Sequence, residues 1–299
     1  MSEQSERPTT KVRSALPWLK EAIVIGAVYI VYGLVRNQFG SAKLNVGDEP
    51  RHAFNNAVAI IDIEEATGLF HEQTIQRWFL DTPWIPFFNI FYGTAHFAVT
   101  LGVLIWLFVR HRAPFGRWRS TLVATTVIGL IGFALFPLMP PRLFNAEPHE
   151  CRQRPDTEVC NVYRYGGAEL ARETNQPDYE FVDTLREVGG LWSFDSKELD
   201  SVSNQYAAMP SLHIGWSVWC AIVLWQFAQR RSSRWLGVIY PFVTLTAIVA
   251  TANHFIIDAA GALLVLGAGY GLARLFERLH TPRPIDVVEH PAEDVLVSN

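Results

Sequence analysis

The sequence has no excess of basic residues. Among its 299 residues, 25 lysines and arginines stand against 29 aspartates and glutamates, which gives a net charge of −4. A protein that binds nucleic acid through phosphate contacts needs a basic surface, and here the basic residues are confined to short segments. The composition therefore argues against nucleic-acid binding, and we expect no nucleic-acid partner.

The long apolar runs lack charged residues and mostly lack a polar face. Hydrophobic residues make up 49% of the chain, in runs that alternate with short charged segments. A core helix of a soluble all-α protein would carry polar residues along one side. Runs of about 20 apolar residues instead match the thickness of a bilayer. We therefore predict an all-α fold, a polytopic membrane helical bundle.

Six transmembrane helices are predicted, at residues 18–35, 86–109, 121–138, 212–227, 235–252 and 256–276. Basic residues precede the first, as in a signal peptide, but no small-residue cleavage site follows, so we expect a retained anchor. Extra interfacial helices are expected at 57–63 and 75–80, with Trp78 and Trp84 at headgroup depth.

Polar segments divide the chain into three parts. We expect residues 1–16 to be a disordered cytoplasmic arm, 17–280 a six-span membrane domain, and 281–299 a disordered, acidic cytoplasmic tail. Within the membrane domain, residues 140–211 form a long polar outer loop, with short helices at 168–173 and 183–188. Loops of this length are usually functional or partly disordered.

The chain has three cysteines. Cys151 and Cys160 lie close together in the outer loop, where an oxidising compartment would allow a disulfide. Spacing alone does not establish that pairing. Cys220 falls inside the fourth predicted span, where we expect it to pack against its neighbours.

Basic residues flank the predicted spans on one side. They occur in the N-terminal arm, between spans two and three, between spans four and five, and after span six, as Arg110, Arg112, Arg117, Arg119, Arg230, Arg231, Arg234, Arg274, Arg278 and Arg283. The positive-inside rule places these segments in the cytoplasm, with both chain ends. The connections at 36–83, 140–211 and near Asn253 then face outward, and we expect a plasma-membrane protein.

His254 and Asp258 lie four residues apart, at the start of the last predicted span. On a helix this spacing places both side chains on one face. The carboxylate can then bind one ring nitrogen and leave the other as a nucleophile. The alternatives are a buried polar pair that ties two helix ends together, or part of a metal site. One pair supplies too few metal ligands, so we expect no metal and no cofactor.

Ser211 and His213 lie in the segment Met-Pro-Ser-Leu-His at 209–213, where the fourth span begins. A helix N-terminus offers free N–H groups and a positive dipole end, which suit an anion. The alternative is a capping serine beside an interfacial histidine. Arg142 follows two prolines, and its planar guanidinium matches a phosphate, although it could also extend to lipid headgroups.

Tyr92 and His96 are also four residues apart, in the outer half of the second span. They would line a pocket or form hydrogen bonds between helices. All of these chemical groups fall on the outer side of the predicted topology. An arginine, a helix-start histidine and a histidine–carboxylate pair together fit phosphoryl transfer, which needs positioning and charge neutralisation.

These residues carry a family resemblance. Pro-Ser-Leu-His at 210–213, and His254 with Asp258, resemble the second and third signature motifs of the type 2 phosphatidic acid phosphatase superfamily, whose best-known members have Pro-Ser-Gly-His. The run Phe-Pro-Leu-Met-Pro-Pro-Arg at 136–142 and the leucine at 212 are more similar to the inositolphosphotransferase-like branch, which contains inositol phosphorylceramide synthases. The resemblance covers residues 54–275, including 64–72 and 92–96.

The resemblance implies a lipid phosphatase or phosphotransferase whose substrate is a membrane lipid. His254 would attack phosphorus and become a phosphohistidine, with Asp258 orienting it. His213 would protonate the leaving alkoxide and then activate the acceptor, which is water or an alcohol. Ser211 and Arg142, with the N–H groups of the fourth span, would hold the phosphoryl oxygens.

Two departures from the family pattern bear on the substrate. The lysine-then-arginine-proline form of the first motif is absent, and Ile248 stands where an arginine is expected. Fewer cations favour a phosphodiester donor, and hence a transferase. Two other classes stay open: a transporter that uses the histidines as proton relays, and a metal-dependent membrane hydrolase. The sequence predicts no particular oligomeric state.

Overall fold

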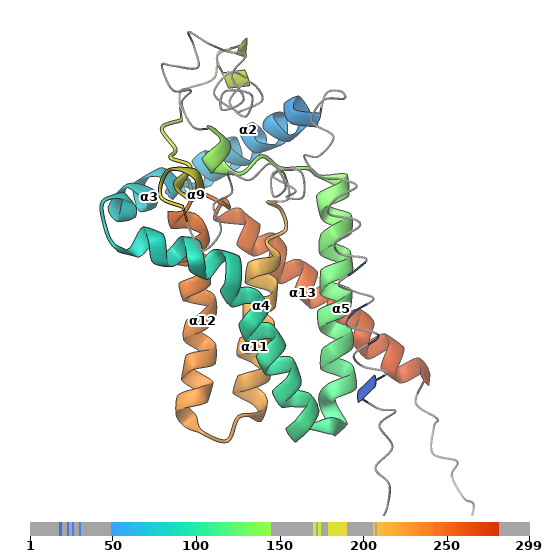
Figure 1. Ribbon diagram of the computed structural model, residues 1–299. Coiled ribbons are helices and arrows are strands. Elements are labelled where there is room, and N and C mark those ends of the chain that lie inside the picture. Colours follow the sequence, from blue (N-terminus) through green and yellow to red (C-terminus); the bar gives the residue numbers. More distant parts are fainter. Residues whose placement is uncertain are drawn as a thin grey trace, which may run out of the picture.

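The computed structural model describes residues 49–144, 170–171, 173–174, 179–189, 206 and 208–280, with five isolated positions between 18 and 30. These residues form helices and connecting segments, and none of them forms a β-strand (Figure 1). The predicted all-α class is confirmed. Of the expected first span at 18–35 only those five positions are described, and the arm at 1–16 and the tail at 281–299 lie outside the described residues.

Four helices are long and apolar enough to cross a membrane: α4 (Trp84–Arg110), α5 (Arg112–Leu135), α12 (Arg231–Ala250) and α13 (Ile257–His280). A fifth apolar helix, α11 (Leu212–Phe227), has 16 residues. At 1.5 Å per residue it covers about 24 Å, less than the roughly 30 Å of a hydrocarbon core. The expectation of six spans is therefore not confirmed; the described residues contain four.

Helix α5 begins nine residues before the predicted start at 121. The basic residues that made this stretch resemble a loop are held by partners on neighbouring helices. Arg117 makes two hydrogen bonds to Glu277 of α13, at 2.7 and 2.9 Å, and Arg112 lies 4.6 Å from the ring centre of Phe108. Long basic side chains can satisfy their charge at a helix end without breaking the helix.

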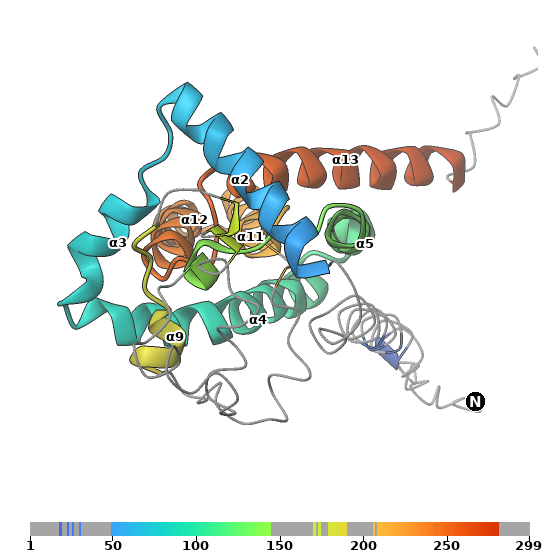
Figure 2. The same cartoon turned by 90° about the horizontal axis from the view of Figure 1, so that it is seen from above.

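The other helices cover one end of the bundle. They are α2 (Glu49–Thr67), α3 (Glu72–Leu80), the short α9 (Thr184–Glu187) and the 3-10 turn Pro141–Phe144. Figure 2 shows α2 lying across this end. The expected helices at 57–63, 75–80 and 183–188 correspond to α2, α3 and α9, and α2 is much longer than expected. We call this end of the molecule the cap.

The cap has its own hydrophobic core. It joins α2 to the segment after α5 and to the turn between α12 and α13, through Phe54, Ile61, Leu138, Met139, Phe144, Phe181 and Phe255. Phe54 and Phe144 stack with ring centres 5.3 Å apart. Because large buried aromatic side chains carry much of the packing energy of a core, this cluster fixes the turn beneath α2.

A second core lies within the bundle, where α11 packs against α4, α5, α12 and α13. Trp219 of α11 is fully buried there, and its indole N–H donates to the Trp118 carbonyl at 3.0 Å. Apolar side chains on the outer faces are exposed, among them Leu135, Phe242, Leu264 and Leu279. A helical bundle with an apolar exterior is suited to a bilayer.

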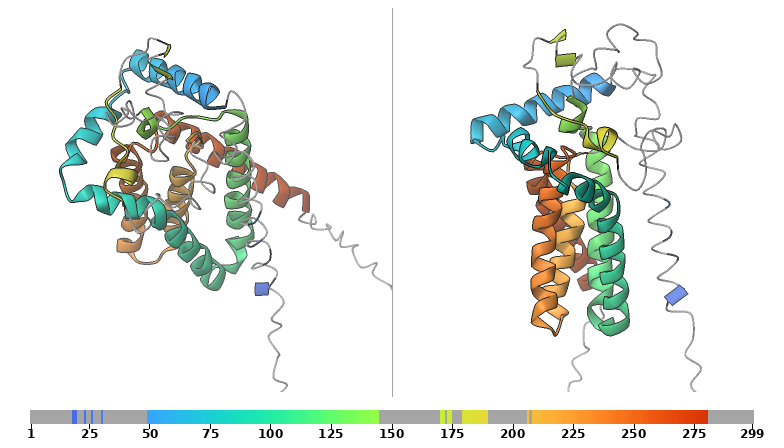
Figure 3. Two further views of the ribbon diagram at one scale, coloured as in Figure 1. Left: turned by 45° about the horizontal axis from the view of Figure 1, so that its top comes forward. Right: turned by 60° about the vertical axis from the view of Figure 1, so that its left-hand side comes forward.

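The two ends of the bundle differ in charge. The α4–α5 and α11–α12 connections lie at the end opposite the cap (Figures 1 and 3). Arginines 110, 112, 230 and 231 lie at these connections. The cap and the basic connections therefore occupy opposite ends of the molecule.

Helices α5 and α13 approach closely at Gly269. A Cβ atom at this position would lie 2.5 Å from Thr125 Oγ1 and 2.8 Å from the Thr125 backbone nitrogen. Real Cβ contacts are longer, so only glycine permits this approach. From here α13 runs obliquely past α5 and extends beyond the bundle (Figure 2).

We predict that Gly269→Ala separates α5 from α13 and lowers the stability of the protein by about 1–3 kcal/mol, the usual cost of overpacking. Gly271→Ala is the matched control, because nothing lies within 4 Å of its added Cβ. Thermal unfolding in detergent, followed by tryptophan fluorescence, compares the two. Equal unfolding temperatures would contradict the close contact.

Candidate active site

His254 lies in the turn that joins α12 to α13, and its side chain is 2% exposed. The backbone N–H groups of Asn253 and His254 donate to the Ile248 carbonyl at 2.9 and 3.3 Å. The Asn253 amide donates to Thr251 Oγ1 at 2.8 Å. Ala252 has a φ of 52°, in the left-handed region that costs energy for any residue with a side chain. The turn is thus held in one uncommon conformation.

Asp258, in the first turn of α13, contacts His254. The His254 Nδ1 and Asp258 Oδ2 atoms are 3.0 Å apart, and the Phe255 N–H donates to the same oxygen at 3.0 Å. Because this oxygen accepts a hydrogen bond from an amide, it acts as an acceptor, and Nδ1 carries the ring proton. Nε2 of His254 then keeps its lone pair. The structure brings the pair together as the spacing indicates.

The protonation of His254 follows from its surroundings. Burial lowers its pKa to about 4; the Ala208 backbone, which favours the protonated ring, opposes this shift, and the nearby charge of Arg142 adds to it. At neutral pH the ring is therefore uncharged. An uncharged imidazole with one nitrogen fixed as a donor presents the other as a nucleophile.

Ser211 and His213 approach His254 from the start of α11. Ser211 Oγ lies 3.4 Å from His254 Nε2, and the His213 and His254 ring centres are 5.5 Å apart. The Ser211 side chain makes no capping hydrogen bond to its own helix. Its backbone N–H donates to the Asp258 carbonyl at 3.3 Å. The starts of α11 and α13 are thus joined at the side of His254 that carries the free nitrogen.

Tyr92 and His96 of α4 lie against His213. Their ring centres are 4.5 and 4.2 Å from that of His213, and Tyr92 stacks on it at 21°. Nδ1–H of His96 donates to the Tyr92 carbonyl at 3.0 Å. Trp216 continues the stack, 5.8 Å from His96. The two residues therefore form an aromatic support that orients His213, while their predicted role in lining a pocket stays a prediction.

Arg142 lies in the 3-10 turn that follows α5. Its backbone N–H donates to the Ala252 carbonyl at 2.8 Å, which joins it to the turn that carries His254. Its guanidinium contacts Asp183 at 2.8 Å. Nε of Arg142 is buried and has no acceptor among the described residues. A buried donor without an acceptor is costly, and a phosphoryl oxygen would satisfy it.

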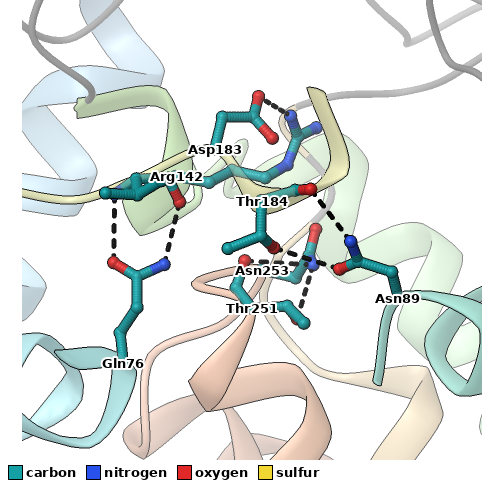
Figure 4. A network of polar contacts seen from close by, with 8 residues as sticks. Gln76, Asn89, Arg142, Asp183, Thr184, Thr251 and Asn253 are labelled. Atoms are coloured by element: carbon teal, nitrogen blue, oxygen red, sulfur yellow. Dashed lines mark hydrogen bonds and ion pairs between the residues drawn. The ribbon is translucent and has the colours of Figure 1, made fainter. Parts of the chain in front are cut away.

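Residues 179–189, which we call the strap, pass over this end of the site (Figure 4). The Gln76 side chain of α3 exchanges two hydrogen bonds with the Val182 backbone, at 2.8 and 3.0 Å. Asn89 of α4 does the same with Thr184, at 2.9 and 3.0 Å. Helices α3 and α4 therefore fix the strap so that its Asp183 meets Arg142.

Three carboxyl groups at the site received no role in catalysis or phosphate binding from the sequence analysis. Asp183 lies in the long polar loop and belongs to no motif. Glu64 and Glu72 flank the α2–α3 turn, and each accepts a hydrogen bond from the start of α13. In the sequence, the one sign of these two glutamates is that they lie eight residues apart, on either side of Gly68. In the structure Gly68 has a φ of 71° and forms the turn between the two helices.

The sequence analysis also made predictions about a disulfide and about metal binding. Cys151 and Cys160 lie outside the described residues, so their pairing stays a prediction. Among the residues that the structure describes, no group of three or more His, Cys, Asp or Glu side chains is arranged to hold a metal ion.

Comparison with known proteins gives one match. The sequence model of the PAP2 superfamily matches residues 58–272, a stretch that contains every candidate catalytic and phosphate-binding residue described above. No curated protein and no solved structure matches the chain. The predicted superfamily is confirmed, and the inositolphosphotransferase-like branch stays a prediction. With its four apolar spans, this chain is an integral membrane protein that belongs to the PAP2 superfamily of phosphatases and phosphotransferases.

Proposed function

We propose that the protein transfers a phosphoryl-containing group from a lipid phosphoester to an alcohol or water, through a phosphohistidine at His254. The observation that carries this proposal is the state of His254. It is buried, with Nδ1 bound to Asp258 and Nε2 facing the start of α11. This is the arrangement of an activated imidazole nucleophile.

In the first step, Nε2 of His254 attacks phosphorus, and the bond from phosphorus to the lipid alkoxide breaks. His213 acts as the acid and gives a proton to the leaving oxygen, while Asp258 balances the positive charge that develops on His254. In the second step, neutral His213 takes the proton of the acceptor hydroxyl. The acceptor oxygen then attacks phosphorus, and the phosphorus–nitrogen bond breaks. Arg142, Ser211 and the first N–H groups of α11 hold the phosphoryl oxygens.

The charge of the site supports a phosphodiester donor. The Arg142 guanidinium is already paired with Asp183, and position 248 is a fully buried isoleucine. A guanidinium that is already partly neutralised suits the one negative charge of a diester better than the two of a monoester. We therefore favour a transferase that moves an inositol-phosphate-like group to an alcohol over a lipid monoester phosphatase.

The polarity of the bundle supports a site on the extracytoplasmic side of the plasma membrane. The cap carries the site, and the arginine-rich connections lie at the opposite end (Figure 3). Because positively charged connections stay in the cytoplasm, the cap would face outward. The donor headgroup would meet the histidines there, with its apolar tails against the exposed outer faces of the helices.

The first test concerns His254. With phosphatidylinositol labelled at phosphorus, rapid denaturation in alkaline detergent should trap label on the wild-type protein, because a phosphorus–nitrogen bond survives alkali. His254→Ala should trap none and should reduce turnover to about one thousandth or less. His52→Ala, at an exposed position on α2, is the control. Full turnover by His254→Ala would refute the mechanism.

The second test separates the acid role of His213 from simple positioning. His213→Gln should slow turnover of a donor with an alkyl leaving group by about 10²–10⁴-fold, the usual contribution of an acid–base group. A p-nitrophenyl phosphodiester should lose far less in the first step, because nitrophenolate leaves without a proton. The nitrophenol burst measures that step. An equal loss with both donors would assign His213 another role.

The third test concerns the charge at Arg142. Asp183→Asn keeps an acceptor for the guanidinium but removes the negative charge. We expect kcat/KM for a phosphate monoester, relative to a diester, to rise about tenfold, which corresponds to about 1.4 kcal/mol. Glu173→Gln is the control, since Glu173 pairs with Arg51 at an exposed position. An unchanged ratio would show that Asp183 does not set donor charge.

A further inference from the structure

Two buried glutamates of the cap reach the turn that carries His254. Glu64 lies near the end of α2 and Glu72 at the start of α3, and both side chains are 0% exposed. Burying a carboxyl group is costly unless it is hydrogen-bonded or neutralised. Neither glutamate has a role in the reaction steps given above.

Both glutamates bind backbone N–H groups that directly follow His254. The Ile256 N–H donates to Glu72 Oε1 and the Ile257 N–H to Glu64 Oε1, each at 2.7 Å. The Phe255 N–H donates to Asp258. These amides precede or open α13, where no helical carbonyl is available to them. Three carboxyl groups from three helices thus fix three successive peptides.

The remaining carboxyl oxygens identify a shared proton. Oε2 of Glu64 and Oε2 of Glu72 are buried and have no N–H or O–H donor among the described residues. Yet the Glu72 side chain is a hydrogen-bond partner of Glu64. Two carboxyl groups can bond to each other only through a proton that one of them carries. One proton shared by the two carboxyl groups would satisfy the oxygens that lack a donor.

Electrostatics favour the same arrangement. Burial raises the pKa of Glu64 to about 9, together with the hydrogen bond to Glu72 and the negative charges of Glu72 and Asp258. At neutral pH Glu64 therefore holds a proton. A third ionised carboxylate beside His254 would also repel an anionic phosphoester, and the shared proton removes that charge.

We propose that Glu64 and Glu72 are positioning residues which share one proton and, through the Ile256 and Ile257 amides, hold the turn that aims His254 at phosphorus. This inference deepens the proposed function and rests on it for its catalytic consequence. The structural part, two buried carboxyl groups that anchor the start of α13, stands on the hydrogen bonds alone.

Glutamine substitutions test the shared proton, because glutamine resembles a protonated glutamate. In Glu64→Gln or Glu72→Gln, the amide oxygen still accepts the backbone N–H and the amide N–H donates to the remaining carboxylate. Each single variant should keep phosphatidylinositol turnover within about threefold of wild type. In the double variant two NH2 groups face each other, and because neither can accept a hydrogen bond, they repel and displace the turn. We expect kcat to fall about 10²-fold, the cost of misplacing a catalytic group by about 1 Å. A double variant no worse than either single one would overturn the proposal.

Proton-sensitive measurements give a readout that does not depend on catalysis. Infrared spectra at pH 7 should contain a protonated carboxyl band in wild type and lack it in both single variants. A group whose pKa rises on folding from 4.5 to about 9 stabilises the fold fully below pH 4.5 and loses that contribution as pH rises to 9. Between pH 7 and 9 the unfolding temperature should therefore fall in wild type and fall less in Glu64→Gln.

Two controls separate the inference from its premise. Glu65→Gln, at the exposed neighbouring position, should change neither turnover nor the carboxyl band. His254→Ala should retain the band and the pH dependence of unfolding while losing turnover. If His254→Ala stays active, the proposed reaction fails although the carboxyl pair stands. If the wild-type spectrum has no protonated carboxyl band, the shared proton is refuted, and the proposed reaction at His254 is not affected.

Discussion

The contact between His254 and Asp258 depends on a turn whose backbone amides have no helical partners. Asp258, Glu72 and Glu64 accept the amide hydrogens of residues 255, 256 and 257 in succession. The same Asp258 oxygen also binds Nδ1 of His254. Helix capping and nucleophile orientation are therefore one hydrogen-bond system, and neither can change without the other.

The two hydrophobic cores position different parts of the active site. The bundle core around Trp219 aligns α4, α5 and α11, and so fixes the height at which α11 begins. The cap core around Phe54 and Phe255 holds the segment that bears Arg142 and the turn that bears His254. The reacting groups lie where these cores meet. Apolar packing therefore fixes the distances between the reacting side chains more closely than their polar contacts alone would.

What the sequence could predict was local. The four-residue spacing of His254 and Asp258, and the placement of His213 in the first turn of α11, follow from helix geometry. The contacts that escaped join distant segments: Asp183 to Arg142, and Glu64 to Ile257, 193 residues away. The basic start of α5 resembled a loop because its partner, Glu277, lies on a helix at the other end of the chain. No local pattern encodes such pairings, which only tertiary packing creates.

Helix α13 is inclined to the rest of the bundle, and it carries Asp258 in its first turn (Figure 1). Its 24 residues cover about 36 Å, more than the roughly 30 Å of a hydrocarbon core, and a helix that is too long for its bilayer tilts. Thinner or thicker lipid would favour a different inclination of this helix. Because Asp258 in the first turn of α13 contacts Nδ1 of His254, the inclination of this helix and the orientation of the imidazole are linked.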